Sequence, residues 1–424
     1  MNNASSFNTV SVIGLGYIGL PTAAMFASRR TRVIGVDCNA KVVEMINRGQ
    51  IHIVEPELDI VVHGVVSEGY LRATTKPEPA DAFLIAVPTP FKEGFAPDLA
   101  FVECAARSIA PVLKRGDLVI LESTSPVGTT EQVSAWLAEC RPDLRFPKWG
   151  TDGPADVCVA YCPERVLPGQ VVHELVSNDR VIGGLTAQCA KRAVELYRIF
   201  VQGDLHVSDA RTAEMCKLSE NSFRDVNIAF ANELSTICHQ LGIDVWRLIE
   251  LANRHPRVKI LQPGAGVGGH CIAVDPWFIV SSAPEQAHLI CTARQVNDAK
   301  PQWVVERVME AVAAAEAARR ATESDLTVAV LGLSFKPNID DLRESPALHI
   351  AESLSQQLRG RMVAVEPNIS ELSGQLAGVE LLELQDALEC ADVIVALVAH
   401  REFDGLKAFV KPGQFLVDAV GLCR

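Results

Sequence analysis

The chain has 424 residues, of which 48% are hydrophobic, and it carries a formal net charge of −13 at pH 7. This length accommodates two or three domains with well-filled cores, and the composition excludes a disordered chain. The acidic balance excludes a nucleic-acid surface as the expected partner, because binding to phosphate backbones needs clustered cationic side chains.

Cysteine usage and hydropathy indicate the compartment. Twelve cysteines are scattered along the chain, and no CxxC pair occurs among them. Scattered thiols are typical of a reduced protein rather than of a disulfide framework or a zinc site, so we expect no metal. Residues 1–9 are polar and lack the features of a secretory signal, and no apolar run reaches membrane-spanning length. We therefore expect a cytoplasmic protein with no membrane partner.

The first predicted element is a strand over residues 9–13, and a helix is predicted to begin near Pro21. Between them stands a GxGxxG motif, which is weak evidence alone but in this context is typical of a dinucleotide-binding unit. Its first glycine permits a tight turn, its second lets a pyrophosphate approach the backbone, and its third lets helix and strand pack closely. The phosphates would lie at the helix N-terminus. The motif residues predicted to bind the cofactor are Gly14, Gly16, Tyr17, Ile18 and Gly19.

A second strand over residues 32–36 ends in Asp37. An acidic residue at this point would bind the adenosine ribose 2′-hydroxyl and repel a 2′-phosphate, which favours NAD over NADP. The alternative role of Asp37 is to cap a helix that begins near Asn39. The spacing of Asp37 from the glycines favours the ribose role.

Further apolar runs over residues 82–87, 118–123 and 157–161 each end in polar residues. Such runs predict a parallel sheet whose ligand crevice lies at the carboxyl ends of its strands. For any one polar residue there, a loop or capping role explains its presence about as well. The candidate site residues at these ends are Thr89, Thr124, Glu164 and Arg165.

One long helix is predicted over residues 208–241, because no proline or glycine interrupts the stretch and Ser208 or Asp209 could cap its start. Three polar residues of this helix share one face, namely Lys217, Asn221 and Arg224.

This polar face has two interpretations. A lysine, an asparagine and an arginine in one stripe could bind phosphate and stabilise an oxyanion. The alternative is a solvated face whose ion-pair partners are Glu220 and Asp225, and the helix considered alone favours that alternative.

A glycine-rich loop over residues 264–271 ends in Cys271, four residues before Asp275. Glycines let substrate approach a nucleophile closely, and a dinucleotide fold on the same chain offers a hydride acceptor. Together they predict oxidation through a thiohemiacetal, taking an alcohol past the aldehyde to the acid. The alternative, in which Cys271 is a small buried hydrophobe, leaves the glycines unexplained. The basic cluster at 254–257 could neutralise a pyrophosphate.

The last part of the chain repeats the α/β pattern, with strands predicted over residues 327–333, 362–366, 393–397 and 415–418. The glycine fingerprint is absent here, so we expect a domain for another nucleotide ligand. The charged segment 313–325 is interpreted as the join to the central helices. The predicted fold is thus of the α/β class, with two Rossmann-like doubly wound domains joined by a central helical region that contains one long helix.

Six motifs carry a family resemblance over essentially the whole chain, in the order GLGYIGLP, STSPVGT, PERVLPG, EMCKLSENSFRDVNIAFANE, NRHPRVKILQPGAGVGGHCIAVDPWF and GLSFKPNIDDLRESP. In them the chain resembles the UDP-glucose/GDP-mannose dehydrogenase family. The resemblance implies an NAD-binding domain over 1–207, a central helical dimerisation region over 208–312 and a UDP-binding domain over 313–424. It also implies a homodimer or a dimer-based oligomer, and a four-electron oxidation that uses two NAD molecules in succession.

The resemblance also implies roles for single residues. Cys271 would be the nucleophile, while Lys217 and Asn221 would stabilise oxyanions, with Lys217 also a candidate acid or base. Asp275 and Thr124 would position water for thioester hydrolysis, with Glu164 as a candidate base. Arg343 would approach NAD, and Arg257 would act on the site of a neighbouring subunit. The residues that would hold the nucleotide sugar are Arg165, Val166, Lys217, Asn221, Arg224, His255, Arg257, Gly268 and Lys336.

Substrate choice rests on the segments GGHCIAVDPWF and NRHPRV, which resemble members that oxidise UDP-N-acetyl-D-mannosamine for enterobacterial common antigen and related polysaccharides. His270 and Val274 depart from the glucose-type pattern, which disfavours UDP-glucose. UDP-N-acetylglucosamine or another UDP-hexosamine remains an alternative, because one contact can decide between C2 epimers. Two further alternatives are a two-electron hydroxyacid-type dehydrogenase, which needs no thiol, and a catalytically silent nucleotide-sugar sensor.

Overall fold

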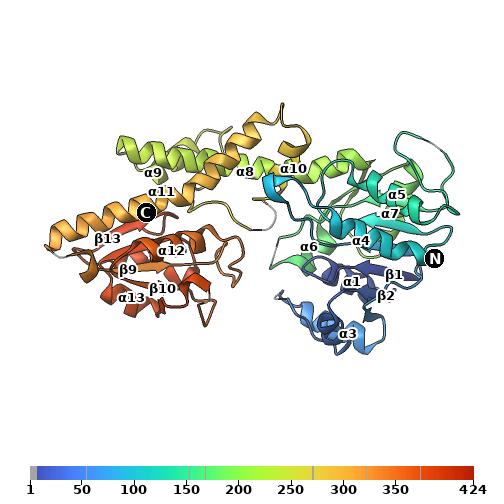
Figure 1. Cartoon of the computed structure of the whole chain (residues 1–424), viewed down its shortest axis with the longest axis horizontal. Helices are drawn as coiled ribbons and strands as arrows, with labels where there is room; N and C mark the ends of the chain where they lie inside the picture. The colour runs from blue at the N-terminus through green and yellow to red at the C-terminus, as the bar shows by residue number, and fades with distance from the viewer. Residues whose placement is uncertain are drawn as a thin grey trace. The chain divides into compact units, whose positions relative to one another are not determined.

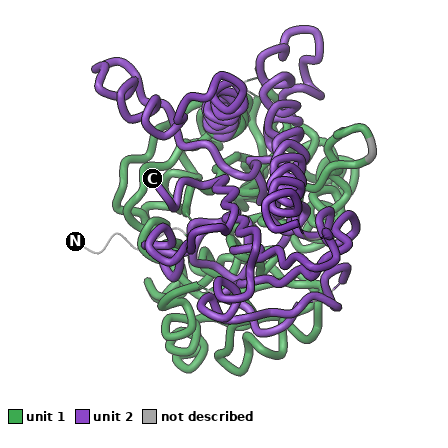
Figure 2. Tube along the Cα trace, turned by 90° about the vertical axis from the view of Figure 1, so that its left-hand side faces the viewer, with its two compact units in different colours: residues 1–220 green, residues 221–424 purple. Residues whose placement is uncertain are grey.

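The computed structural model describes residues 7–53, 55–151, 153–167, 169–269, 272–320, 322–372 and 374–424. The chain folds into two compact units, residues 1–220 and residues 221–424 (Figure 2). The boundary between them falls inside helix α8, Ala210–Leu241, so one continuous helix belongs to both units.

The first unit is built on an eight-stranded sheet with the order β3-β2-β1-β4-β5-β6-β7-β8. Its strands are β1 Thr9–Ile13, β2 Arg32–Val36, β3 Leu71–Thr74, β4 Ala82–Ile85, β5 Leu118–Leu121, β6 Cys158–Tyr161, β7 Arg180–Gly184 and β8 Leu205–Asp209. All neighbouring strands are parallel except β6 and β7, which are antiparallel. The strand order reverses between β1 and β4, which is where such sheets bind ligands.

Helices cover both faces of this sheet. They are α1 Gly19–Ser28, α2 Ala40–Asn47, α3 Leu58–Ser67, α4 Ala100–Ile109, α5 Thr129–Cys140, α6 Val171–Ser177 and α7 Ala187–Tyr197 (Figure 1). One core contains Phe26 of α1 and Leu196 of α7, and the other contains Val102 of α4 and Val133 of α5. Alternate residues of each strand enter opposite cores, which explains why the strands are apolar throughout.

The second unit contains a parallel five-stranded sheet with the order β11-β10-β9-β12-β13. Its strands are β9 Thr327–Leu331, β10 Arg361–Val365, β11 Glu380–Leu381, β12 Val393–Ala396 and β13 Phe415–Asp418. The remaining helices are α9 Val245–Ala252, α10 Asp275–Ser282, α11 His288–Arg319, α12 Pro346–Gln357 and α13 Leu384–Cys390. Two sheets of the α/β type and a long central helix confirm the predicted fold class.

The long helices differ in how far the sequence revealed them. Asp209 caps α8 as predicted, because its carboxylate accepts hydrogen bonds from the Thr212 backbone N–H at 3.0 Å and from the Thr212 hydroxyl at 2.7 Å. Helix α11 has the same length of 32 residues as α8 but was not predicted as one element. Its pattern is interrupted by Pro301, which the helix nevertheless accommodates.

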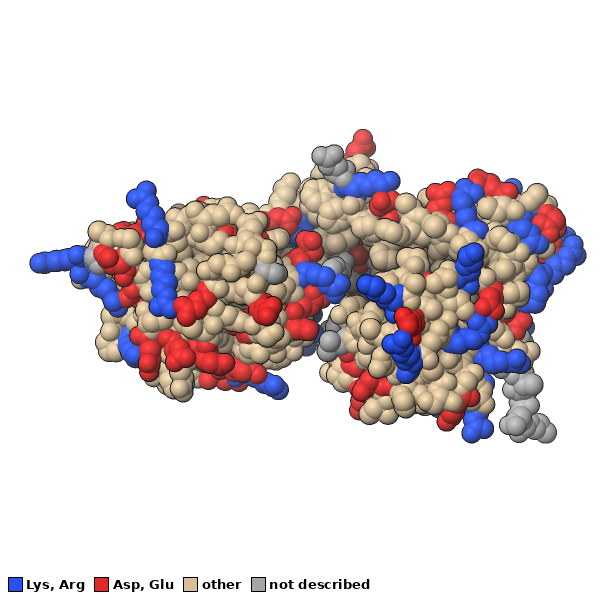
Figure 3. Space-filling model, turned by 60° about the horizontal axis from the view of Figure 1, so that its bottom comes forward, with Lys and Arg blue, Asp and Glu red and all other residues tan. Residues whose placement is uncertain are grey.

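On the face shown in Figure 3, acidic and basic side chains are intermixed, with a run of acidic side chains at the lower left. No helix in the described part of the chain is long and apolar enough to cross a membrane.

Candidate active site

The glycine turn after β1 has the geometry that the GxGxxG motif predicts. Gly14 has φ +90°, and a Cβ there would lie 2.4 Å from the carbonyl oxygen of Ala86. A Cβ at Gly19 would lie 1.8 Å from the carbonyl oxygen of Gly14, so this glycine lets α1 pack on the turn. A Cβ at Gly16 would meet nothing within 4 Å. The open space therefore lies at Gly16, next to the N-terminus of α1, where a pyrophosphate fits.

The Asp37 carboxylate holds this turn in place. Its Oδ2 accepts the Leu15 N–H at 3.1 Å and its Oδ1 accepts the Asn39 N–H at 2.8 Å. Helix α2 is capped by Asn39, whose side chain accepts the Lys41 N–H at 3.0 Å, so the alternative of Asp37 as the cap is wrong. The half-buried Asp37 thus stands at the end of β2, which is the position that recognises a ribose in such folds.

Thr89 and Thr124 lie together at the carboxyl ends of β4 and β5. The Thr89 hydroxyl donates a hydrogen bond to the Thr124 carbonyl oxygen at 2.6 Å. Strand β5 ends two residues before the predicted boundary because Glu122 N and Ser123 N both donate to the Ile85 carbonyl oxygen, at 2.9 and 3.2 Å.

Glu164 and Arg165 follow β6, and both are engaged in ion pairs. Glu164 is 7% exposed, and its Oε2 lies 3.1 Å from Nη2 of Arg180. Arg165 holds Glu220 of α8 in a bidentate contact, with Nη2–Oε1 at 2.7 Å and Nε–Oε2 at 3.1 Å. The ion pair with Arg180 was not predicted, because a single arginine at the start of a strand gives no sequence signal.

The polar face of α8 contains a contact between two predicted catalytic residues. The Asn221 side-chain amide donates a hydrogen bond to Asp275 Oδ2 at 2.5 Å. Asp275 is 2% exposed and is the first residue of α10, where the helix dipole favours its negative charge. Lys217 lies one turn before Asn221 on the same helix, about 6 Å along its axis.

The alternative interpretation of this face is wrong in its pairings. Glu220 pairs with Arg165, and Asp225 forms a buried ion pair with Arg294 of α11, with Nη1–Oδ1 at 2.6 Å. Burial raises the pKa of the Asp225 carboxyl, while Arg294 opposes the rise. Within the described part of the chain, Lys217 has neither of the two expected carboxylate partners.

The glycine loop of the second unit packs against the segment 335–346. A Cβ at Gly268 would lie 2.2 Å from the Glu344 carbonyl oxygen, and a Cβ at Gly269 would lie 3.0 Å from the Phe335 ring. The glycines are therefore required by close packing of the protein on itself, in addition to any approach of substrate. The contact brings Gly268 next to the segment that carries Lys336 and Arg343. The Arg343 guanidinium pairs with Asp341, with Nη2–Oδ2 at 2.7 Å.

Other predicted residues lie apart from these contacts. Arg224, His255 and Arg257 are exposed, and Arg257 N donates to His255 Nδ1 at 3.3 Å. Val166 packs against the first core. Cys271, the predicted nucleophile, and its neighbour His270 lie outside the described residues.

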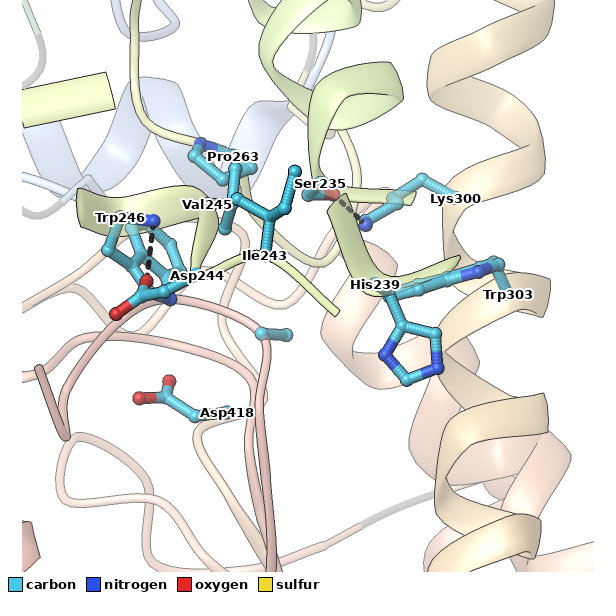
Figure 4. Close-up of a pocket in the computed structure, with 11 residues that line it drawn as sticks. Ser235, His239, Ile243, Asp244, Val245, Trp246, Pro263, Lys300, Trp303 and Asp418 are labelled. Carbon is cyan, nitrogen blue, oxygen red and sulfur yellow. Dashed lines mark hydrogen bonds between the residues drawn. The ribbon is translucent and has the colours of Figure 1, made fainter. Parts of the chain in front are cut away.

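A separate cavity of about 220 Å³ lies in the second unit (Figure 4). None of the predicted site residues is among the described residues that line it. Lys300 of α11 is 4% exposed, and its Nζ donates to Ser235 Oγ at 2.5 Å and lies 3.7 Å from the Trp303 ring centroid. Burial lowers the pKa of the Lys300 amine to about 7. The sequence around Lys300 gives no signal that this lysine is buried.

Three family models match the chain in order. They are the NAD-binding, central and UDP-binding domains of the UDP-glucose/GDP-mannose dehydrogenase family, over residues 8–201, 211–299 and 329–424. The chain belongs to this family. Membership confirms the predicted resemblance, NAD as the cofactor, and a UDP-binding domain at the C-terminal end.

Individual members of the family are similar over the full chain. The UDP-N-acetyl-D-mannosamine dehydrogenase of Yersinia pestis is 63% identical over 420 residues, which is 99% of this chain and 100% of the relative. The NDP-N-acetyl-D-galactosaminuronic acid dehydrogenase of Ralstonia nicotianae is 61% identical over 416 residues, 98% of this chain and 96% of the relative. The solved structure of a UDP-D-ManNAc dehydrogenase from Pyrococcus horikoshii superposes with a TM-score of 0.87 at 40% identity, covering 98% and 96% of the two chains.

Proposed function

We propose that this protein oxidises C6 of UDP-N-acetyl-D-mannosamine to give UDP-N-acetyl-D-mannosaminuronate, for a bacterial surface polysaccharide of the enterobacterial common antigen type. The observation that carries the proposal is the contact of Asn221 with Asp275, four residues after Cys271, in a family member 63% identical to a UDP-N-acetyl-D-mannosamine dehydrogenase. We place the reaction in the cytoplasm, because the scattered cysteines suit a reducing compartment.

The cofactor residues fit NAD. The open space at Gly16 and the Asp37 carboxylate at the end of β2 would hold its pyrophosphate and ribose, together with Tyr17, Ile18, Thr89, Thr124 and Arg343. When bound, NAD supplies the hydride acceptor for both oxidations.

The chain's own residues perform the remaining steps. Cys271 attacks the C6 aldehyde and retains it as a thiohemiacetal, so that the reactive intermediate does not escape. Lys217 and Asn221 donate hydrogen bonds to the oxyanion, each contributing about 3 kcal/mol. Once the thioester has formed, Asp275 and Thr124 position a water molecule. Glu164 takes one proton from this water as its oxygen bonds to the carbonyl carbon.

The nucleotide part of the substrate would be held by basic residues and by the glycine loop. Arg165, Arg224, His255, Arg257 and Lys336 offer cationic or hydrogen-bonding groups for the diphosphate, with Arg257 serving a neighbouring subunit. Val166 and Gly268 would contact the sugar nucleotide through backbone and apolar surface. The three domains of this proposal keep the divisions 1–207, 208–312 and 313–424.

The surface of α8 supports a homodimer as part of this proposal. Phe223, Phe230 and Ile237 are 73%, 50% and 44% exposed and recur every seven residues. A seven-residue spacing places them along one side of the helix, where a second copy of the chain would cover them.

The test is the NADH yield for each UDP-N-acetyl-D-mannosamine consumed, with the N-acetylglucosamine and N-acetylgalactosamine sugars run alongside. Two NADH from the mannosamine sugar, and little from the other two, supports the proposal. A preference for the N-acetylgalactosamine sugar would instead favour the activity named for the Ralstonia nicotianae relative. A yield of one NADH, with activity surviving Cys271→Ala, would support the two-electron alternative. Tight binding without NADH would support a sensor.

A further inference from the structure

A group of buried ionisable side chains lies at the carboxyl ends of β5 and β6 in the first unit. Glu122 follows β5 directly, Glu164 lies three residues after β6, and Arg180 is the first residue of β7. Their exposed fractions are 2%, 7% and 3%. Burial of charged groups is costly unless they are paired, so this group needs an explanation.

The antiparallel strand β7 brings the arginine to this edge. In the pairing of β6 with β7, Ala160 faces Gly184 and Tyr161 faces Gly183. Continuing the same register by three residues sets Arg180 opposite Glu164. The ion pair between Arg180 Nη2 and Glu164 Oε2, at 3.1 Å, agrees with this placement. The other oxygen of Glu164 accepts the Arg165 backbone N–H at 2.6 Å, whereas Oε2 faces Arg180 without a hydrogen bond among the described residues.

A second carboxyl shares the same arginine. Glu122 Oε1 accepts the Tyr197 hydroxyl at 2.6 Å, and the Arg180 guanidinium carbon lies 4.9 Å from the centroid of the Tyr197 ring. In the described part of the chain, Glu122 Oε2, Glu164 Oε2 and the Nε and Nη1 atoms of Arg180 have no hydrogen-bond partner. Burial raises the pKa of Glu122 to about 7, although Arg180 and the Tyr197 hydrogen bond oppose the rise.

The remaining groups that face Glu122 carry no charge at neutral pH. Burial raises the pKa of the Cys162 thiol to about 12 and raises the pKa of the Tyr197 hydroxyl well above its usual value. The group therefore consists of two carboxyls and one guanidinium. The net charge of the group is zero when one of the two carboxyls keeps a proton. We assign this proton to Glu122, because Glu122 accepts the Tyr197 hydroxyl but forms no ion pair, whereas Glu164 pairs with Arg180.

We propose that Arg180 is a positioning residue that holds its positive charge against the Glu164 carboxylate during the hydrolytic step, with Glu122, which is hydrogen-bonded to Tyr197, leaving that charge to Glu164. This inference rests on the proposed function, in which Glu164 is the base. In that step the water oxygen bonds to the thioester carbonyl carbon, and the C–S bond breaks to return the Cys271 thiolate. One water proton passes to Glu164, and the acid formed releases its own proton to solvent. A protonated Glu164 could not accept the proton, so the rate depends on Arg180.

The first experiment measures thioester hydrolysis as a function of pH in wild type, Arg180→Gln and the charge-conserving Arg180→Lys. Rapid quenching and mass spectrometry follow the acyl adduct on the intact enzyme. In Arg180→Gln we expect the acid limb of the hydrolysis rate to move up by about one pH unit or more, because Glu164 loses its counter-charge. Arg180→Lys should stay close to wild type. If a folded Arg180→Gln enzyme hydrolyses the thioester more slowly by the same factor at every pH, Arg180 has a merely structural role and the proposal is overturned.

A second experiment needs no substrate. Infrared difference spectra of the carboxylic acid C=O stretch should show a band in wild type that disappears as the pH rises through about 7. This band should be absent in Glu122→Gln, and Arg180→Gln should retain a second protonated carboxyl to higher pH. If wild type makes no NADH from any UDP-sugar, the proposed function fails, but these spectra still test the charge group. Identical spectra in wild type and both variants would refute the inference itself.

Discussion

Replacing Lys300 with methionine should stabilise the protein at neutral pH. The amine is buried, and in the described structure it has a serine hydroxyl and an indole ring as partners but no carboxylate. Burial lowers the pKa of Lys300 from 10.5 to about 7. Each pKa unit corresponds to about 1.4 kcal/mol. The buried amine therefore lowers the free energy of unfolding at pH 7 by about 5 kcal/mol, as an upper bound. Methionine has a similar length and no charge to desolvate.

The sign of the pH dependence follows from proton binding. Between pH 7 and 10.5 the unfolded chain carries the proton on this amine and the folded protein does not. Stability from this group therefore falls as the pH is lowered through that range and levels off below about 7. The advantage of Lys300→Met should be about 2–5 kcal/mol at pH 7 and should shrink toward zero near pH 10.

The assay is urea unfolding at pH 7 and at pH 9.5, monitored by tryptophan fluorescence and circular dichroism. Lys300→Arg is the matched control, because arginine keeps its charge at both pH values and should destabilise the protein. Ser235 is not orphaned by either change, since its hydroxyl donates to the Asn232 carbonyl oxygen at 2.6 Å. A Lys300→Met protein that is less stable than wild type by the same amount at both pH values would refute the reasoning.

Four further predictions concern the site and the surface. Asn221→Ala should lower kcat about 100-fold in steady-state assays with little change in the melting temperature, and an unchanged kcat would remove Asn221 from the oxyanion contacts. Gly268→Ala places a Cβ 2.2 Å from the Glu344 carbonyl oxygen and should cost about 1–3 kcal/mol in urea unfolding, whereas a neutral result would mean that the 335–346 segment moves freely. Asp37→Asn should reduce the preference for NAD over NADP about tenfold, measured as a ratio of kcat/KM values, and an unchanged ratio would leave Asp37 as a support of the turn only. Phe230→Glu should convert the proposed dimer to monomer in analytical ultracentrifugation, and a dimer that persists would place the interface elsewhere.

Local patterns in the sequence predicted those elements whose signal is local. A short window of sequence is enough to predict the GxGxxG turn, the strand over residues 9–13 and the uninterrupted helix α8. Strands β3, β7, β8 and β11 were not predicted. Of these, β3, β8 and β11 are edge strands with mixed polarity, and β7 is paired with the edge strand β8. Such strands form because a neighbouring strand offers hydrogen bonds, and this cannot be seen in the segment itself.

In the candidate site, the sequence predicted which residue types matter but not which contacts they make. The sequence predicted Asn221 and Asp275 as functional residues, but their hydrogen bond joins residues 54 positions apart and depends on how α8 and α10 pack. The glycine loop was predicted to admit substrate to a nucleophile. In the structure, Gly266, Gly268 and Gly269 also let the segment 335–346 approach closely, because a Cβ at each of them would lie 3.0 Å or less from an atom of that segment. A glycine thus indicates close approach without indicating which group approaches.

The burial of charged side chains is the feature of this structure that is hardest to predict from sequence. Arg180, Arg294 and Lys300 are each less than 5% exposed, yet in the sequence each is a single cation among ordinary neighbours. For Arg180 the cause is a reversal of one strand, since β7 runs against β6 and delivers its first residue to the edge where the parallel strands end. Had β7 been parallel, its amino end would lie at the opposite edge of the sheet, far from Glu164. The direction of one strand therefore decides whether the proposed base has a counter-charge, and Arg180→Gln is the substitution that measures the consequence.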